Sequence, residues 1–445
     1  VTGTGSILPF PINLPYPTTT ANSDDERIAD LERFEGMLVE FSDTLTVTDL
    51  WTLGRFGEVA LSAGGRLYQF TNDNSPDVAG YAAHWDEIAR RTIILDDGLR
   101  TENPSTIHYL TAGSAAGYSI RLGDTLTGLV GNLRYSRGAD ANGAEGWRVE
   151  PTSDPVFQST NPRPATPGID GALLVAGMNV LNFFTTIDQG QDNCGPGGDA
   201  ACRGADSNTE LTRQREKLVS AMLLSGADIF GLTELQNNST GSLGALVDAL
   251  NSREGGTDFA YIDTGVIHTD VIKAGIIYRR SVVTPVGNFV LLDRSVDSRY
   301  NDARNRPSLA QAFSANANGA RLSVVVAHLK SKSSSCDADG DPNTGDGQGN
   351  CNLTRTSAAI ALAGWLAGDP TGSGDPDFFV IGDLNSYAME DPIIALEDLG
   401  LTNLVKQYLG AYTYSYTFDG LAGYLDHGLG SGSATYQTFG STIWH

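Results

Sequence analysis

The sequence predicts an α/β protein in which an α/β sandwich of two mixed sheets follows a small β-barrel domain. Short strand-like runs separated by turn residues fill the region before residue 158. After residue 170, apolar strands alternate with amphipathic helices, and several strands follow one another directly, which disfavours a doubly wound sheet. Three prolines within residues 162–167 forbid regular structure between the two regions. We therefore expect two domains joined by a linker over residues 158–170.

The first domain is expected to be built from short strands. Residues 1–30 are rich in proline, threonine, serine and aspartate without lasting periodicity, so we expect an extended lead-in there. Residues 31–157 form the expected β domain. Its strand-like runs lie at residues 35–39, 43–47, 57–61, 92–95 and 126–130.

The second domain, residues 171–445, is expected to be the sandwich. Strands of the buried type are predicted at residues 173–184, 228–233, 275–278, 309–313, 322–327 and 378–381. Helices are predicted at residues 211–224 and 353–366, and Leu211, Leu218 and Met222 share one face of the first helix.

Composition and cysteine spacing indicate an exported globular protein. A hydrophobic content of 40% over 445 residues is enough to bury a full core. The longest apolar run, residues 171–184, is interrupted by two asparagines and is shorter than the roughly 20 residues of a membrane helix, so no membrane span is expected. The chain begins at Val1 without a signal sequence, which we expect was removed or lies outside it. We expect a monomer.

The four cysteines form two local pairs in loops rich in glycine and aspartate. Cys194 pairs in sequence with Cys202, and Cys336 with Cys351. Neither pair has the spacing of a metal site, and no histidine lies near either one, so we expect two disulfides. Because disulfides persist in oxidising compartments, this predicts an extracellular location.

The charge of the chain limits its partners. Acidic residues outnumber basic ones 53 to 29, giving a formal net charge of −24. Such a charge ordinarily disfavours polyanionic partners, because phosphate contacts depend on lysine and arginine. The lysines are concentrated, however: none precedes Lys217, and two lie in the string from His328 to Lys332. We expect the remaining acidity to serve solubility.

Polar side chains interrupt or follow two of the predicted strands early in the second domain. Asn179 lies within the strand at 173–184, and Glu234 comes directly after the strand at 228–233. Alone, such an asparagine is more often satisfied by backbone partners, and such a glutamate by a salt bridge. Because Mg²⁺ takes oxygen ligands and often uses only one or two carboxylates, Glu234 is a candidate metal ligand.

Two later strands end in groups suited to acid and base chemistry. His328 follows the strand at 322–327 with two lysines beside it, and can donate charge or a proton to a phosphate oxygen. Asp383 and Asn385 follow the strand at 378–381 in a Gly-Asp-Leu-Asn string, where they can deprotonate and hold a water. Asp426, beside a histidine, can orient an imidazole or contact a metal-bound water. Strand ends of α/β folds converge, so we expect one site.

Taken in chain order, these residues resemble the motifs of the DNase I-like endonuclease/exonuclease/phosphatase superfamily, over essentially residues 173–445. Longer strings are similar to those of bacterial extracellular nucleases of the ExeM/NucH type. These strings are Val180–Phe184, Cys202–Asp206, Asn301–Pro307, His328–Lys332, Gly345–Asn352 and Tyr424–His427. The resemblance implies a four-layered α/β sandwich preceded by an OB-like β-barrel, in a secreted bacterial nuclease acting on DNA, and leaves open whether RNA is also a substrate.

The resemblance also implies roles for individual residues. Glu234 would bind a catalytic Mg²⁺ or Mn²⁺, with Asn179 beside it. Asp383 and Asn385 would activate and position the attacking water, and Asp426 would support a second histidine. The pentavalent phosphate would be stabilised by His328 and bound by Arg306 and Lys330. The metal would act as a Lewis acid and a template.

The superfamily's last motif, a Ser-Asp-His near the C-terminus, is absent. The six histidines are His84, His108, His268, His328, His427 and His445. Because the chain stops soon after Asp426, we expect that the motif was lost by truncation. A genuine loss would remove the general base and leave the protein nearly inactive.

A second metal is considered in the acidic loop closed by Cys336 and Cys351. Asp337, Asp339 and Asp341 resemble the start of a calcium loop. Pro342 stands where such a loop turns on glycine, and no glutamate follows at the twelfth position. The residues leave a structural Ca²⁺ site and a solvated acidic loop equally open.

Two other functions fit the same residues. A phosphomonoesterase or a phospholipid phosphodiesterase would use the same scaffold, because a fold does not fix its substrate. A secreted protein that binds nucleic acid or a cell surface would keep the scaffold without turnover. Endo against exo cleavage, DNA against RNA, and the identity of the metal stay open at this point.

Overall fold

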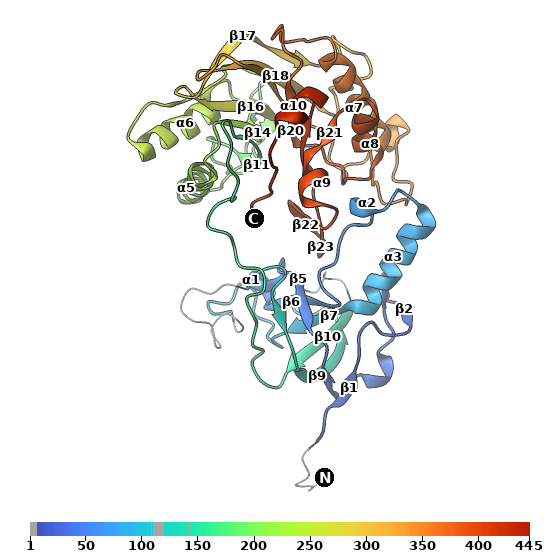
Figure 1. Ribbon diagram of the computed structural model, residues 1–445. Helices are drawn as coiled ribbons and strands as arrows, with labels where there is room; N and C mark the ends of the chain where they lie inside the picture. The colour runs from blue at the N-terminus through green and yellow to red at the C-terminus, as the bar shows by residue number, and fades with distance from the viewer. Residues whose placement is uncertain (1–6, 108, 110–119, 141–142, 144) are drawn as a thin grey trace. The chain divides into compact units, whose positions relative to one another are not determined.

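The computed structural model describes residues 7–107, 109, 120–140, 143 and 145–445, so the histidine at 108 lies outside the described residues. The chain forms two compact units, whose course can be followed by colour in Figure 1. The N-terminal unit comprises residues 1–70, 77–163 and 416–423, and the sandwich unit comprises residues 71–76, 164–415 and 424–445. The chain passes from one unit to the other between Arg163 and Pro164, and two short segments, residues 71–76 and 416–423, belong to the unit opposite to that of their sequence neighbours.

The N-terminal unit is built on one eight-stranded sheet. Its strands, in spatial order, are β1 (Phe10–Ile12), β4 (Leu38–Phe41), β9 (Leu129–Ser136), β10 (Gly146–Pro151), β7 (Thr92–Asp96), β6 (Glu58–Ala63), β5 (Leu45–Asp49) and β8 (Thr125–Leu126). The expected lead-in is therefore partly sheet, since β1 pairs in parallel with β4. β1 and β8 stand at opposite ends of the order, and no pairing in the described ranges joins them, so the predicted OB-like barrel is not confirmed.

A helix interrupts the region that the sequence predicted to be all strand. α3 (Val78–Arg91) follows the first turn signals, and the side chain of Asp77 caps its N-terminus by accepting from the Gly80 amide. Only two of its residues, Ile88 and Ala89, are buried. The helix lies between the runs predicted as strands at residues 57–61 and 92–95, where the sequence analysis predicted no helix. The unit also contains α1 (Leu53–Phe56), β2 (Thr19–Ala21), β3 (Arg27–Ala29), β22 (Tyr416–Phe418) and β23 (Leu421–Gly423).

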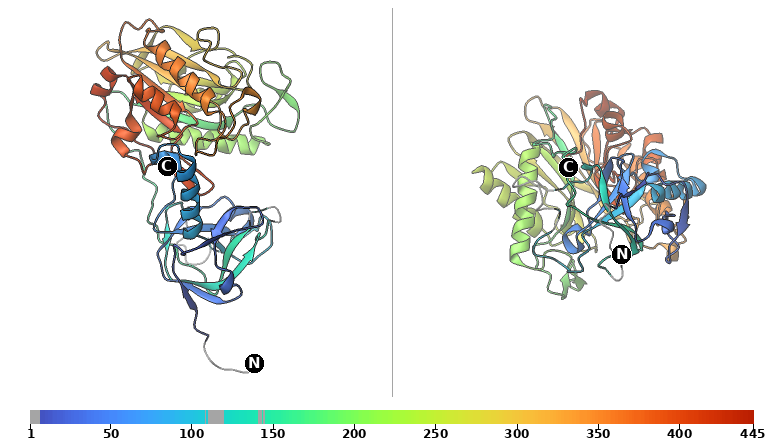
Figure 2. Two further views of the ribbon diagram at one scale, coloured as in Figure 1. Left: turned by 90° about the vertical axis from the view of Figure 1, so that its right-hand side faces the viewer. Right: turned by 90° about the horizontal axis from the view of Figure 1, so that it is seen from below.

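The sandwich unit contains the two mixed sheets that the sequence predicted, and further views of them are given in Figure 2. The four-stranded sheet has the order β11 (Val175–Phe183), β14 (Ile229–Gln236), β16 (Ile272–Arg279) and β15 (Phe259–Tyr261). The six-stranded sheet has the order β17 (Val283–Leu292), β18 (Arg306–Ala315), β19 (Arg321–His328), β20 (Phe378–Asp383), β24 (Asp426–Gly430) and β21 (Thr402–Asn403). Parallel pairing occurs between β11 and β14 and between β19 and β20.

Three apolar clusters divide this unit into four layers. Side chains of β14, β16, β18, β19 and β20 meet between the two sheets. The outer face of the four-stranded sheet packs against α5 (Asn208–Ser225) and α6 (Gly241–Glu254). The outer face of the six-stranded sheet packs against α7 (Asn352–Leu366) and α8 (Asp391–Asp398). The helix, sheet, sheet, helix arrangement is the four-layered sandwich expected from the resemblance.

Shorter elements complete the structure. They are η1 (Glu32–Phe34), α2 (Phe70–Asp73), β12 (Asp192–Cys194), β13 (Ala200–Ala201), η2 (Asp337–Asp339), α9 (Leu404–Leu409) and α10 (Gly432–Gln437). Both predicted disulfides form, between Cys194 and Cys202 and between Cys336 and Cys351. In the part of the chain that the structure describes, no helix is both long enough and apolar enough to cross a membrane.

Candidate active site

Both sheets contribute strand ends to one cluster of polar side chains. Glu234, His328 and Asp383 offer ligand atoms that all lie within 4.8 Å of one another. Glu234 belongs to β14 in the four-stranded sheet, and the other two end β19 and β20 in the six-stranded sheet. Asn179 of β11 bridges the cluster, because its Nδ2 donates to Glu234 Oε1 at 3.0 Å and to Asp383 Oδ2 at 3.2 Å. The structure therefore brings together four residues that lie far apart in the sequence.

Irregular backbone aims Glu234 into this cluster. The pairing register of β14 shifts between Leu232 and Leu235, and Glu234 itself has a positive φ of 63°. Such a conformation is uncommon for a residue other than glycine and is often found at functional sites. The neighbouring strand β11 is also irregular after Asn179, and the amide of Asn182 there donates to Glu234 Oε2 at 2.9 Å. Both carboxylate oxygens are thus oriented by donors from one strand.

Asp383 is positioned by the close approach of two strands. A Cβ at Gly382 would lie 2.3 Å from the Ala327 carbonyl oxygen, and Gly382 has a φ of 127°, so only glycine fits there. The approach places His328 Nε2 3.8 Å from Asp383 Oδ2. The Asn385 amide donates to Asp383 Oδ1 at 2.9 Å, and Asn385 Nδ2 donates to the Leu329 carbonyl at 3.1 Å. Asn385 therefore holds the loops after β19 and β20 together.

The carboxylates of the cluster repel one another. Burial, followed by the charges of Asp426 and Glu234, raises the pKa of Asp383 well above its usual range. Burial and the charge of Glu234 likewise raise the pKa of Asp426, and Asp426 Oδ1 is buried without a hydrogen-bond partner. Three acidic groups with an unsatisfied oxygen fit a divalent cation, which takes oxygen ligands and relieves such repulsion.

Histidine 328 is a neutral group in this environment. Burial, then the charges of Arg306 and Lys330, hold the pKa of His328 well below its usual range. Arg306 lies directly opposite His328 in the pairing of β18 with β19. A neutral imidazole can donate a hydrogen bond but carries no positive charge, so of the two roles that the sequence allows for His328 the first fits this environment. Positive charge comes from the neighbouring cations.

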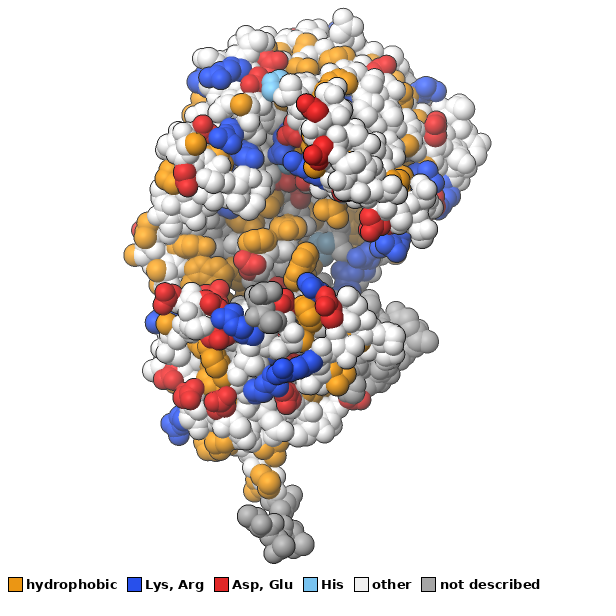
Figure 3. Space-filling view, turned by 180° about the vertical axis from the view of Figure 1, so that it is seen from behind, with side chains coloured by type: hydrophobic (Ala, Val, Ile, Leu, Met, Phe, Trp, Pro, Cys, Tyr) orange, Lys and Arg blue, Asp and Glu red, His pale blue; other side chains and the backbone are white. Residues whose placement is uncertain are grey.

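The predicted phosphate-binding residues form part of a basic group. Arg306 Nε lies 2.9 Å from Asp270 Oδ2, and burial with the charges of Arg306 and Arg304 lowers the pKa of Lys330. The Asn305 side chain joins the two segments by accepting from the Lys330 amide at 3.0 Å. On the face shown in Figure 3, lysine and arginine side chains occur among acidic ones, so the acidity of the chain is not uniform over this surface.

Asp426 and the adjacent His427 do not act as a pair. Asp426 lies opposite Asp383 in the pairing of β20 with β24, whereas His427 lies opposite Gly382. Successive residues of a strand point to opposite faces of the sheet. His427 Nε2 instead contacts the Ser386 carbonyl at 2.8 Å, and burial lowers its pKa to about 4. The suggestion that Asp426 orients a neighbouring imidazole therefore does not apply to His427.

The acidic loop of the calcium hypothesis uses two of its carboxylates within the protein. Asp341 accepts from the amides of Leu353 and Thr354 at 3.1 and 2.8 Å and thereby caps α7. Asp339 Oδ2 lies 2.6 Å from Arg304 Nε. The three carboxylates, Asp337 included, do not appear together in a metal-type cluster of the described residues.

Several positioning residues were missed by sequence reasoning. Asp270 holds Arg306, and Gln214 of α5 donates to the carbonyls of Val180 and Leu181 at 3.1 and 2.8 Å, which fixes the irregular end of β11. Neither residue lies in a motif or at the end of a predicted strand. Asn305, which accepts from the Lys330 amide, is a third such residue, and it is the one of the three that lies in a string quoted for the family resemblance, Asn301–Pro307.

Comparisons with known proteins place the chain in a family. The family model described as "Endonuclease/Exonuclease/phosphatase family" matches residues 179–444, which is more than half of the chain. A comparison with curated proteins found no match.

Solved structures give more distant similarities. The human Nocturnin catalytic domain with bound sulfate is 14% identical, with a TM-score of 0.34 over 50% of this chain and 75% of that one. A mannosyl-6-phosphatase from Bacteroides thetaiotaomicron is 16% identical, with a TM-score of 0.36 over 50% and 78%. D. rerio TDP2 complexed with single strand DNA product is 16% identical, with a TM-score of 0.36 over 59% and 85%. These values are too low to transfer an activity. It is the family match, with the four-layered sandwich and the cluster at its strand ends, that shows the chain to belong to the endonuclease/exonuclease/phosphatase family, whose members are phosphoester hydrolases.

Proposed function

We propose that this protein is a secreted, divalent-metal-dependent phosphodiesterase that hydrolyses nucleic acid, of the bacterial extracellular nuclease type. The observation that carries the proposal is the convergence of Asn179, Glu234, His328 and Asp383 at the ends of strands from both sheets. A cluster of one buried and two half-buried acidic side chains, beside the cations Arg306 and Lys330, suits an anionic substrate that is attacked by water.

Glu234 would hold a divalent cation, Mg²⁺ or Mn²⁺, with the carboxylates of Asp383 and Asp426 close by. A cation bound there supplies Lewis acidity toward a phosphate oxygen and neutralises the acidic cluster. Asn179 orients the carboxylates of Glu234 and Asp383 through its bridging amide. In this role the asparagine acts through its two acidic partners, and it need not contact the cation itself.

The remaining residues handle the water and the phosphate. Asp383, whose pKa is raised by burial and by Asp426, accepts the proton of the attacking water. Asn385 fixes Asp383 through its amide, and its side chain fixes the loop after His328. His328 donates a hydrogen bond to a phosphate oxygen, and Arg306 and Lys330 stabilise the charge that builds up as the bond to the leaving oxygen breaks.

The test compares two variants on supercoiled plasmid DNA in the presence of Mg²⁺ or Mn²⁺. Glu234→Gln and Asp383→Ala each remove one carboxylate of the cluster, and we expect each to reduce the rate of cleavage by about 10²- to 10⁴-fold without unfolding the protein. Glu216→Gln on α5 is the matched control, because Glu216 lies in a surface ion pair with Arg253. Unchanged rates in either site variant would refute the assignment.

The same assay separates the other phosphoesterase activities. A nuclease cleaves plasmid DNA and bis(p-nitrophenyl) phosphate and loses plasmid cleavage steeply as salt rises, because phosphate contacts are screened. Hydrolysis confined to p-nitrophenyl phosphate would indicate a phosphomonoesterase, and hydrolysis confined to p-nitrophenylphosphorylcholine would indicate a lipid phosphodiesterase. Binding of DNA without hydrolysis of any of these would indicate a binding protein.

Two disulfides support export of the protein. We expect the native protein to be found in the culture medium with no free thiols. Recovery from the cytoplasm with four reactive thiols would contradict the proposed location.

A further inference from the structure

A short segment from the N-terminal part of the chain belongs to the sandwich unit. Thr71 and Asn72 are each only 1% exposed. The Met389 amide donates to the Thr71 carbonyl at 2.9 Å, and the Tyr424 amide donates to Asn72 Oδ1 at 3.2 Å. The Asn72 side chain also donates to the carbonyl of Ala411. Residues 71–76 are therefore an integral part of this unit, although residues 77–163 separate them in the sequence from the rest of it.

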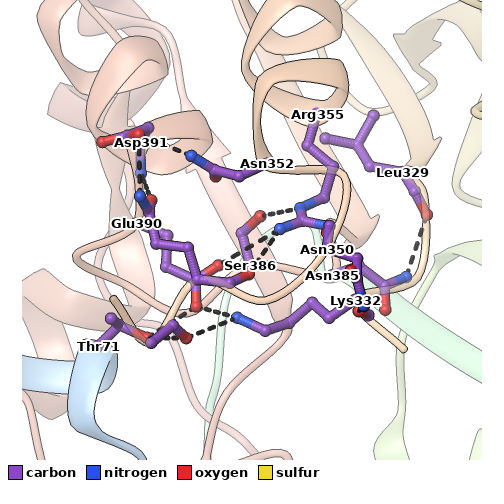
Figure 4. Close-up of polar contacts among 12 residues, drawn as sticks. Thr71, Leu329, Lys332, Asn350, Asn352, Arg355, Asn385, Ser386, Glu390 and Asp391 are labelled. Carbon is purple, nitrogen blue, oxygen red and sulfur yellow. Dashed lines mark hydrogen bonds and ion pairs between the residues drawn. The ribbon is translucent and has the colours of Figure 1, made fainter. Parts of the chain in front are cut away.

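The hydroxyl of Thr71 contacts a buried acid, Glu390, as Figure 4 shows. Thr71 Oγ1 donates to Glu390 Oε1 at 2.7 Å, and Lys332 Nζ donates to the same oxygen. A nitrogen of the Arg355 guanidinium lies 4.0 Å from Glu390 Oε2. Glu390 and Arg355 are both fully buried. The stability of a fully buried charge depends on the hydrogen-bond donors and opposite charges of the protein around it, because water does not solvate it.

Arg355 connects this acid to the two loops of the candidate active site. Its Nε donates to Ser386 Oγ at 3.1 Å, next in sequence to Asn385. One of its terminal nitrogens donates to the Lys330 carbonyl at 3.2 Å, two residues after His328. Asn385 Nδ2 in turn donates to the Leu329 carbonyl. The loops after β19 and β20 are thus fastened to one buried network, and Figure 4 shows Thr71 at its edge.

We propose that Thr71 is a positioning residue of the active site, which holds the loops after His328 and Asp383 in place through Glu390, Lys332 and Arg355. The proposal rests on the proposed function only for its activity measurement. Removing the hydroxyl leaves Glu390 Oε1 with Lys332 as its remaining donor. The Glu390 carboxylate is then oriented by Lys332 alone, so its orientation toward Arg355 changes. Arg355 in turn holds the two loops less firmly. A small displacement of catalytic groups is enough to lower the rate of a reaction.

The test uses the full chain and the pair Thr71→Val and Thr71→Ser. Thr71→Val keeps the shape and removes the hydroxyl, whereas Thr71→Ser keeps the hydroxyl. Thr48→Val is the matched control, because Thr48 is also buried and donates its hydroxyl to a carbonyl, that of Gly420, in the N-terminal unit. With bis(p-nitrophenyl) phosphate we expect kcat to fall about tenfold in Thr71→Val, with KM little changed. We expect wild-type kcat in Thr71→Ser and Thr48→Val.

Hydrogen exchange gives a readout that does not need a substrate. The amides of Leu329, Lys330 and Asn385 are hydrogen-bonded to Asp383, Asn305 and Asp383. We expect them to exchange about tenfold faster in Thr71→Val and at the wild-type rate in the other two variants. If the wild-type chain hydrolyses no phosphodiester, the proposed function is refuted. The exchange rates of these three amides would still show whether Thr71 holds the loops in place.

Two results would overturn the proposal. One is a folded Thr71→Val protein with wild-type kcat and wild-type exchange at these amides. The other is an equal loss of kcat in Thr71→Val and Thr48→Val, which would show a general effect of stability. If Thr71→Val does not fold, Glu390→Gln replaces it, since it keeps the volume and removes the charge that Lys332 and Arg355 share. Faster exchange at the same three amides supports the proposal, and unchanged exchange overturns it.

Discussion

In the N-terminal unit, the guanidinium of Arg148 lies 3.1 Å from Glu58 and 3.7 Å from Asp96, on three neighbouring strands, and all three side chains are buried. In the sandwich unit, burial and neighbouring acids instead raise the pKa of Asp383 and of Asp426, and burial keeps the pKa of the neighbouring His328 well below its usual range. Arg306, whose charge acts on His328, is already paired with Asp270. Buried charge with a partner stabilises a fold, whereas buried charge of one sign at strand ends indicates a site for a ligand of the opposite sign.

Removing the buried cation Arg148 and removing the buried acid Asp383 are expected to have opposite effects on the free energy of unfolding. Arg148→Met leaves two buried acids without their cation, so we expect the free energy of unfolding to fall by about 3–5 kcal/mol. Asp383→Asn removes one of three repelling acids, so we expect unchanged or increased stability of the metal-free protein. Urea unfolding followed by tryptophan fluorescence measures both. A destabilised Asp383→Asn protein would show that the acidic cluster is structural, like that of Arg148.

Protons and a divalent cation compete for the carboxylates of the acidic cluster. Because the pKa of Asp383 is raised, its carboxyl group stays protonated over part of the range in which an ordinary aspartate is charged. A cation must displace that proton, so the affinity of the acidic cluster for a divalent cation falls as the pH is lowered and rises as the pH is raised. We expect Mn²⁺ affinity to increase by up to about tenfold per pH unit between pH 6 and 8, for each proton displaced. Titration followed by electron paramagnetic resonance measures this, and a pH-independent affinity would contradict it.

The smallest effect is expected in the acidic loop near α7. Asp339 and Arg304 form a partly exposed ion pair, so we expect Asp339→Asn to change the free energy of unfolding by less than about 1 kcal/mol. Added Ca²⁺ should leave the melting temperature of the wild-type chain unchanged, because Asp341 is used to cap the helix. A clear rise in melting temperature with Ca²⁺, lost in Asp339→Asn, would establish the calcium site that the sequence left open.

The strands of the sandwich and most residues of the cluster were predictable from the sequence. Buried strands of an α/β fold are apolar along their whole length, so a polar residue stands out, whether it lies within the strand as Asn179 does or near its end as Glu234 does. The Gly-Asp-Leu-Asn string was informative for a steric reason, since Gly382 is needed for the close approach of β20 to β19. The family match then covers the same residues.

Other features depend on contacts that a linear pattern does not contain. Thr71 lies in the string Phe70–Asp73, whose composition predicts only a turn, and its partner Glu390 is more than three hundred residues away. Arg355 has the sequence context of an exposed cation on an amphipathic helix and is fully buried. The sequence places Asp426 and His427 side by side, whereas successive residues of a strand point to opposite faces of the sheet, so a linear pattern does not show which of them faces Asp383.

The exchanged segments have a consequence for the way this chain can be divided. Residues 71–76 contribute to the sandwich unit, and residues 416–423 contribute to the N-terminal unit, where Leu421 packs with Leu67 and Ile88. A cut in the proline-rich linker would thus separate two fragments, each of which retains a strip that belongs to the other. Protein engineers who wish to graft or shorten this protein must keep each of the two segments with the unit to which it belongs, or supply a substitute for it.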